Sequence, residues 1–182
     1  MPAAGEGRSV RVMSLVAFAI VLATIVIYVG LINAQRASDQ PYISRFVAGY
    51  MALMAALLVI ALVPRPEIVP IRVAIRAAVA SGLFLLGFLF SFPVGLAFVA
   101  AGFLVFFALR RTAREATRSR PARLSGLVAA ALAVAVLLVG LEVAQRVIVC
   151  PERGNAVGGG PGLITGPYQY ECVNGVAHYH GR

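Results

Sequence analysis

Five long apolar runs dominate this chain and leave it few ways to fold. Each run is roughly 17 to 26 residues long, and about 20 helical residues cross the hydrocarbon core of a bilayer. Hydrocarbon offers no hydrogen-bond partner to the backbone, so each crossing segment must be helical. The runs cover approximately residues 12–33, 45–63, 73–91, 93–109 and 124–149. We therefore predict an all-α integral membrane protein with a five-helix transmembrane bundle.

Composition supports this class, because the chain is 60% hydrophobic and only 13% charged, whereas soluble domains carry about 25% charged residues. Two polar segments remain outside the bundle of residues 12–149. We interpret residues 1–11 as a cytoplasmic N-terminus and residues 150–182 as a separate tail. Neither is long enough to form a hydrophobic core without a covalent or metal crosslink.

The third and fourth runs are separated only by Ser91, Phe92 and Pro93. Proline is favoured at the first position of a helix, so we predict a tight helical hairpin rather than one long broken helix. The first apolar run is about 20 residues long, whereas the apolar region of a cleaved signal peptide spans 7 to 15. We therefore expect the first helix to be an uncleaved anchor.

Arginine predicts the orientation, because basic residues are enriched on the cytoplasmic side of a membrane. With the N-terminus inside, eleven of the 16 basic residues, all of them arginine, face the cytoplasm; these are Arg8, Arg11, Arg65, Arg72, Arg76, Arg110, Arg111, Arg114, Arg118, Arg120 and Arg123. Five crossings then place the C-terminus outside the cell membrane. The arginines border apolar runs, so we interpret them as topology signals facing anionic lipid and predict no nucleic-acid partner. The lysine-free, alanine-rich composition suggests a bacterial source.

The two cysteines of the chain, Cys150 and Cys172, both lie in the tail. An extracytoplasmic compartment is oxidising, so we predict a disulfide. By the loop-entropy model, closing a loop of this length contributes about 3 kcal/mol of stability. The alternative is a pair of free thiols.

The end of the tail predicts a β-hairpin. Asn174-Gly175 lies between strand-forming residues, and this dipeptide favours a two-residue type I′ turn. The alternation of side chains then puts Tyr168, Tyr170 and Tyr179 on the same face as Cys172. We expect this disulfide-stapled hairpin to pack through its tyrosines over the outer mouth of the bundle, while the GGGPG segment before it turns freely. The alternative is a loosely ordered tail.

Three polar residues near the end of the fifth run form a candidate intramembrane site: Glu142, Gln145 and Arg146. An ionisable group inside a membrane is costly and indicates a function by default. Glu142 and Arg146 are four residues apart, so they face each other on a helix. We favour an interfacial salt bridge that anchors the helix to the tail, and keep an ion or proton site as the alternative.

His178 and His180 share one face of the hairpin, with Glu171 opposite His178. Two histidines and a carboxylate are a weak candidate metal site or pH sensor. A solvated polar face is the interpretation we favour, and we predict no cofactor.

The chain offers no phosphate-binding loop and no nucleophile–base pair, and we predict no enzymatic activity. Small residues repeat every four positions in the fifth run, which is typical of helix packing. We predict an accessory or assembly subunit of a larger membrane complex, or a homo-oligomer, whose partners are the bilayer and other membrane subunits or copies of itself. The alternatives are a transport or channel component with Glu142 and Arg146 near an outer gate, and an envelope sensor acting through the tail.

Overall fold

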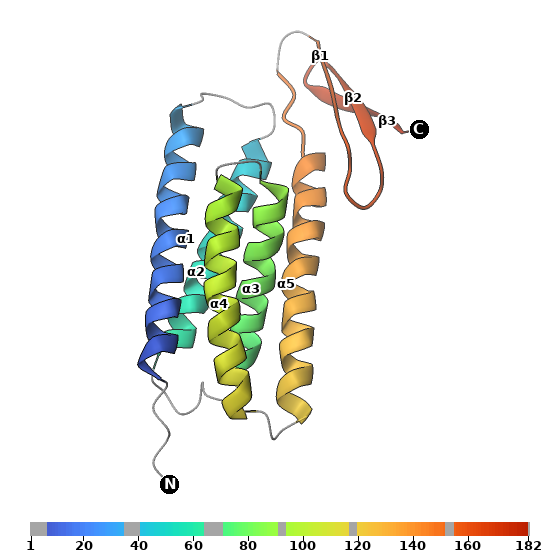
Figure 1. Cartoon of the computed structure of the whole chain (residues 1–182). Helices are drawn as coiled ribbons and strands as arrows, with labels where there is room; N and C mark the ends of the chain where they lie inside the picture. The colour runs from blue at the N-terminus through green and yellow to red at the C-terminus, as the bar shows by residue number, and fades with distance from the viewer. Residues whose placement is uncertain are drawn as a thin grey trace. The chain divides into compact units, whose positions relative to one another are not determined.

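The computed structural model describes residues 7–34, 41–63, 71–90, 94–116, 120–151 and 155–181. These residues form five helices followed by a small antiparallel sheet (Figure 1). The elements are α1 (Arg8–Ala34), α2 (Pro41–Leu62), α3 (Arg72–Leu89), α4 (Val94–Ala116), α5 (Arg120–Arg146), β1 (Ala156–Gly160), β2 (Tyr168–Val173) and β3 (Val176–Gly181). All five helices are long and apolar enough to span a membrane, which confirms the predicted helices by length and composition.

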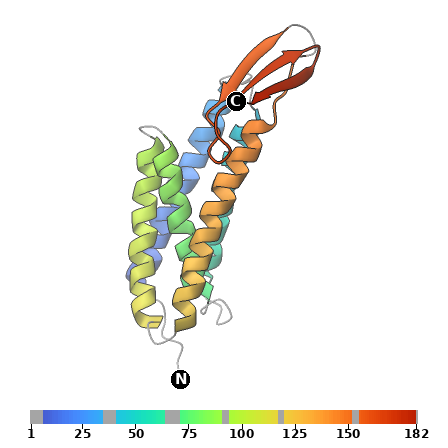
Figure 2. The ribbon, with the colours of Figure 1, turned by 90° about the vertical axis from the view of Figure 1, so that its right-hand side faces the viewer.

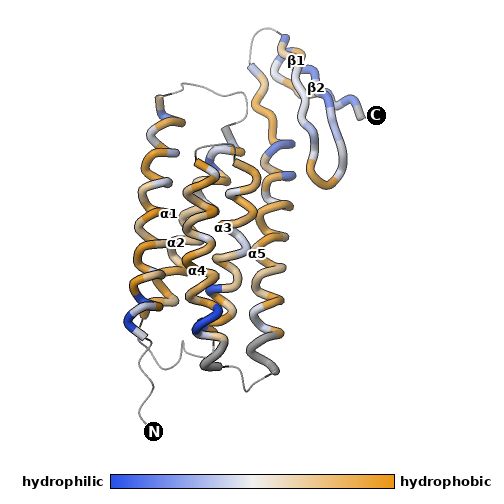
Figure 3. The backbone as a smooth tube through the Cα atoms, viewed as in Figure 1, coloured by the Kyte–Doolittle hydropathy of each residue, from blue (hydrophilic) through white to orange (hydrophobic). Residues whose placement is uncertain are grey.

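The helices extend past most of the apolar runs that predicted them. Figure 3 shows hydrophilic turns at several helix ends, beyond the long hydrophobic stretches. For example, α4 continues from the predicted end at 109 to Ala116, because arginine, alanine and glutamate favour helix even where the chain ceases to be apolar. At the C-terminal end of α5 the prediction was too long, because the helix ends at Arg146 and the predicted run continued to residue 149. The predicted connection at residues 91–93 lies outside the described residues.

The chain divides into two compact units. The first contains most of α1, the second half of α2, all of α3 and α4, and α5 through Ala135. The second contains the adjoining ends of α1 and α2, the remainder of α5, and the sheet. The predicted position of the tail over the mouth of the bundle stays a prediction.

In the first unit, α3 and α4 are two separate helices that pack closely, as the predicted hairpin requires. Glycines permit this approach: a Cβ atom on Gly87 would lie 2.9 Å from the carbonyl oxygen of Gly95. Farther along, the Phe84 ring covers Gly102 and meets the Phe103 ring edge-on, with 5.0 Å between ring centroids. Phe84 and Phe103 thus meet where these two helices pack, whereas Phe88 of α3 is 86% exposed and takes no part in this contact.

The small residues of α5 also pack inside the first unit. The hydroxyl of Ser81 on α3 donates a hydrogen bond to the backbone oxygen of Ala130, at 3.2 Å. Gly126 faces Val73 and Ala77 of α3. In this part of α5 the small residues therefore serve helix packing within the chain, as their spacing indicated.

The second unit ends in a three-stranded sheet with the order β1-β2-β3, which Figure 2 displays nearly face-on. Strands β2 and β3 pair with Val173 opposite Val176 and Tyr170 opposite Tyr179, the register that a two-residue turn requires. Both turn residues have positive φ, 52° at Asn174 and 81° at Gly175. This combination is the type I′ conformation, which Asn-Gly adopts at low cost.

The first strand corrects the sequence interpretation. The glycine segment predicted to turn freely instead forms most of β1, which pairs antiparallel with β2. Gly158 lies opposite Tyr170 and Gly160 opposite Tyr168, and each tyrosine ring covers its glycine so closely that a Cβ atom there would collide with it. A glycine strand is weak alone, but aromatic rings from the neighbouring strand supply the missing packing.

Substituting Gly160 with alanine should destabilise the sheet by roughly 1 to 3 kcal/mol, the usual cost of overpacking. The new Cβ atom would lie 2.8 Å from the Tyr168 hydroxyl oxygen and 2.9 Å from its ring carbons. Hydrogen exchange of the β2 amides would measure the loss. Val157→Ala, at an exposed position on the same strand, is the matched control and should leave exchange nearly unchanged; equal exchange in both variants would contradict the close packing.

Candidate functional site

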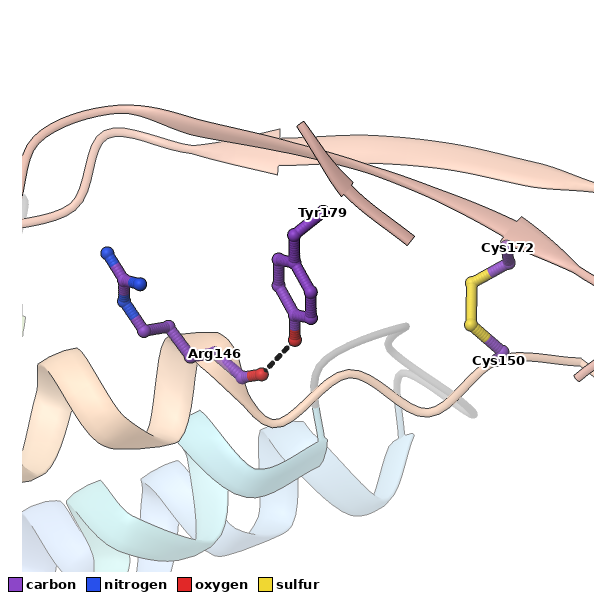
Figure 4. The surroundings of a disulfide bond; sticks show 4 residues. All are labelled: Arg146, Cys150, Cys172 and Tyr179. Carbon is purple, nitrogen blue, oxygen red and sulfur yellow. Dashed lines mark hydrogen bonds between the residues drawn. A yellow bond between two sulfur atoms is a disulfide. The ribbon is translucent and has the colours of Figure 1, made fainter. Parts of the chain in front are cut away.

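The junction between α5 and the sheet gathers most of the residues singled out in the sequence. A disulfide joins Cys150, four residues beyond α5, to Cys172 in β2, with 5.6 Å between their Cα atoms (Figure 4). Cys172 is buried with Tyr168 and Tyr170, and Ile148, Cys150 and Ala156 pack around them. The predicted disulfide is therefore present, and it lies in a small hydrophobic cluster of the second unit.

Two tyrosines of the sheet bind the end of α5. The Tyr168 hydroxyl donates to the backbone oxygen of Gln145 at 2.6 Å, and the Tyr179 hydroxyl donates to that of Arg146 (Figure 4). The last four carbonyls of a helix lack intrahelical partners, so these hydroxyls satisfy two of them. Beyond Arg146 the chain is no longer helical, and it leads within four residues to Cys150, which the disulfide joins to β2.

Glu142 accepts four hydrogen bonds in the last turn of α5. Its Oε2 accepts from the backbone N–H groups of Leu163 and Ile164, at 2.7 and 3.1 Å. Its Oε1 accepts from the Thr165 hydroxyl and from Nε of Arg146, the latter at 3.1 Å. We call these five residues the Glu142 clamp. It ties the loop of residues 161–167, between β1 and β2, to the helix.

The charges of the clamp are arranged to hold a carboxylate where a helix alone would not favour one. The C-terminal end of a helix is negative, so Glu142 by itself is unfavourable there. Arg146 offsets this as the i,i+4 ion-pair partner, and it also donates to the Thr165 hydroxyl. Its guanidinium lies over the Tyr168 ring, 5.5 Å from the centroid. The pair predicted from spacing is therefore part of a larger network.

The shape of the loop depends on two glycines with positive φ, Gly162 at 55° and Gly166 at 85°. Other residues rarely adopt this conformation. A Cβ atom on Gly162 would also collide with the backbone of Gly166. The loop thus folds back on itself, and two consecutive N–H groups converge on one carboxylate oxygen, an arrangement that favours an anion.

Burial raises the pKa of the Tyr168 phenol above 10.0, and the neighbouring Tyr170 and Tyr179 raise it further. The phenol is therefore neutral near neutral pH and keeps the proton that it donates to Gln145. The side-chain oxygen of Gln145 is buried and has no hydrogen-bond partner among the described residues. Tyr168 thus binds the backbone carbonyl of Gln145 and not its side-chain oxygen.

The histidines lie apart from the clamp. The register puts Glu171 opposite His178 and Gln169 opposite His180, and both histidines are exposed. Within the described ranges, no three histidine, cysteine, aspartate or glutamate residues are grouped closely enough to hold a metal ion. The sensor hypothesis stays a prediction that this arrangement does not test.

The structure brings out contacts that sequence reasoning missed. Arg76, counted above only as a topology signal, is completely buried in the first unit and donates to the Thr112 hydroxyl of α4. The sequence did offer a signal for this burial, because Arg76 lies inside the third apolar run, residues 73–91. Leu163 and Ile164 had no such signal, because they bind Glu142 through backbone N–H groups, which every residue but proline carries. The Thr165 hydroxyl binds Glu142 from 23 positions away, and nothing in the local sequence related the two residues.

No protein family, curated protein or solved structure matches this chain.

Proposed function

We propose that this chain is a non-catalytic integral membrane protein that presents its tail sheet to other proteins outside the cell membrane. It acts as an accessory or assembly subunit of a membrane complex, or as a homo-oligomer. The observation that carries the proposal is the triple attachment of the sheet to α5, by the disulfide, the two tyrosine hydroxyls and the Glu142 clamp. A sheet held in this way is an ordered surface rather than a mobile tail.

Insertion and orientation are parts of the same proposal. Five apolar helices of sufficient length support five crossings. The excess of arginine on one set of connections supports a cytoplasmic N-terminus. The C-terminal tail is then outside the cell, and the disulfide agrees with an oxidising compartment there.

The engagement of Glu142 favours this function over transport. A transported ion or proton needs a group that exchanges partners. The Glu142 carboxylate instead receives two backbone amides, a hydroxyl and a guanidinium, which hold a loop in place. Releasing the carboxylate for an ion would leave those donors without their acceptor, at an energetic cost.

The surface available to a partner is the face of the sheet opposite the buried tyrosines. Alternation along the strands places Val157, Glu171, Val173, Val176, His178 and His180 on this face. Val157 and Val176 are exposed there, beside the two exposed histidines. A mixed apolar and polar surface of this kind is compatible with the composition of protein–protein interfaces.

Site-specific photocrosslinking in native membranes tests the proposal. A photoreactive residue at Val157 or Val176 should give a discrete adduct with another membrane protein, or with a second copy, identified by mass spectrometry. The matched control is the same residue at Leu127, an exposed apolar position of α5, which should give lipid adducts. The absence of any discrete protein adduct from both sheet positions would refute the proposed function.

A further inference from the structure

The loop of residues 161–167 does not extend away from the helix. Figures 1 and 2 both show it returning alongside the C-terminal part of α5, next to the turn that carries Glu142. Figure 3 shows hydrophobic residues at the end of this loop. They include Leu163 and Ile164, whose backbone N–H groups bind Glu142.

The side chains of these two residues point away from the packed interior. Leu163 is 42% exposed and Ile164 is 57% exposed. The neighbouring part of α5 is similarly apolar and open, since Val143 is 57% exposed and Val139 lies on the same helix face as Glu142. The loop and the helix end to which it is bound thus both expose apolar side chains.

The position of Glu142 along the helix gives the depth of this surface. The apolar segment of α5 ends at Arg146, and four residues of helix rise about 6 Å. Glu142 is thus about one turn below the point where the span ends. A loop bound to Glu142 lies at this level of the helix, within the outermost turn of the candidate span.

Two features that are each costly at this depth compensate each other. Non-helical backbone in a membrane needs internal partners for its polar groups, and a carboxylate there needs donors. The clamp meets part of both needs at one point, because the N–H groups of Leu163 and Ile164, at the tip of the loop, bind the Glu142 oxygen directly. Thr165 and Arg146 occupy the other oxygen.

We propose that residues 161–167 insert into the outer leaflet of the bilayer as a lipid-contacting loop. Leu163 and Ile164 touch acyl chains, and Glu142 is the positioning residue that holds the loop at this depth. The inference rests on the membrane insertion of α5 proposed above. It assigns the loop to lipid, and the opposite face of the sheet remains the surface for a protein partner.

The chain contains no tryptophan, so a single introduced tryptophan reports its own surroundings. Ile164→Trp and, separately, Leu163→Trp would be placed in the full chain, reconstituted in phosphatidylcholine–phosphatidylglycerol vesicles with and without brominated acyl chains. We expect blue-shifted emission that loses most of its intensity to brominated lipid and almost none to aqueous iodide. Adding Glu142→Gln to either variant should shift the emission to the red and restore iodide quenching.

Two reference variants separate the possible failures. Val157→Trp, on the opposite face of the sheet, should be quenched by iodide and not by brominated lipid. Val143→Trp, on α5, should be quenched by brominated lipid. If Val143→Trp is quenched by lipid while both loop variants are quenched only by iodide, the inserted loop is refuted and the membrane protein stands. If Val143→Trp also escapes brominated lipid, insertion of α5 fails, and the proposed function fails with it.

Discussion

Replacing Cys150 and Cys172 together with alanine will lower the stability of the sheet by about 3 kcal/mol, the loop-closure contribution expected for a disulfide of this span. The two cysteines are 22 positions apart, and without the bond the unfolded tail gains the freedom of that whole loop. An isolated two-stranded hairpin is marginally stable in water, and a three-stranded sheet needs a hydrophobic face or a helix to pack against. A loss of this size therefore leaves the sheet open for a substantial part of the time.

Hydrogen exchange of the β2 and β3 amides in detergent or nanodiscs would measure this loss, and helix content by circular dichroism should not change. Reducing the wild-type protein should reproduce the effect, because the same bond is removed without any substitution. The control is Val157→Ala, which keeps the bond and should exchange like the wild type. Unchanged protection in the reduced protein would mean that the tyrosines and the Glu142 clamp hold the sheet without the disulfide.

Substituting Glu142 with glutamine will release the loop of residues 161–167 while leaving α5 folded. The amide keeps one acceptor oxygen but replaces the other with an NH₂ group, which would face donors. Either the backbone N–H groups of Leu163 and Ile164 or the donors from Thr165 and Arg146 then lose their acceptor. We expect the Leu163 and Ile164 amides to exchange at least about tenfold faster, because charged hydrogen bonds are stronger than neutral ones.

Thr165→Val is the matched control for Glu142→Gln. It removes the hydroxyl donor while keeping a side chain of similar size, and it leaves both backbone amides bound to the carboxylate. Its effect on the exchange of the loop amides should therefore be clearly smaller than that of Glu142→Gln. The same Glu142→Gln protein, tested for ion conductance in planar bilayers, addresses the transport alternative. A change in conductance with unchanged loop exchange would show that the carboxylate serves ions rather than the loop.

Much of the fold could be predicted from local sequence. The five helices follow from apolar runs whose length matches a bilayer, and the register of β2 and β3 follows from Asn174-Gly175. The pairing of Cys150 with Cys172 needed only the inference of an oxidising compartment. The ion pair of Glu142 and Arg146 follows from i,i+4 spacing. Each of these features depends on composition or on residues close in the chain.

The first strand is the clearest case in which local sequence was misleading. Glycine disfavours strands, so the segment before Pro161 reads as a flexible turn. Its strand conformation comes from the Tyr168 and Tyr170 rings of β2, which cover Gly160 and Gly158. The alternating tyrosines of β2 and the run of three glycines in β1 were visible in the sequence, but nothing local related one to the other.

The sequence by itself determined the apolar helices, the hairpin turn and the ion pair of α5, because the length of an apolar run, turn chemistry and helical spacing depend on residues close in the chain. The tertiary structure alone decided what those residues contact. The partners of Glu142 in the loop begin 21 positions away, and Thr112 is 36 positions from Arg76. Donors so far apart in the chain converge only after helix and sheet have formed, and backbone N–H groups, which every residue but proline carries, leave no mark in the sequence.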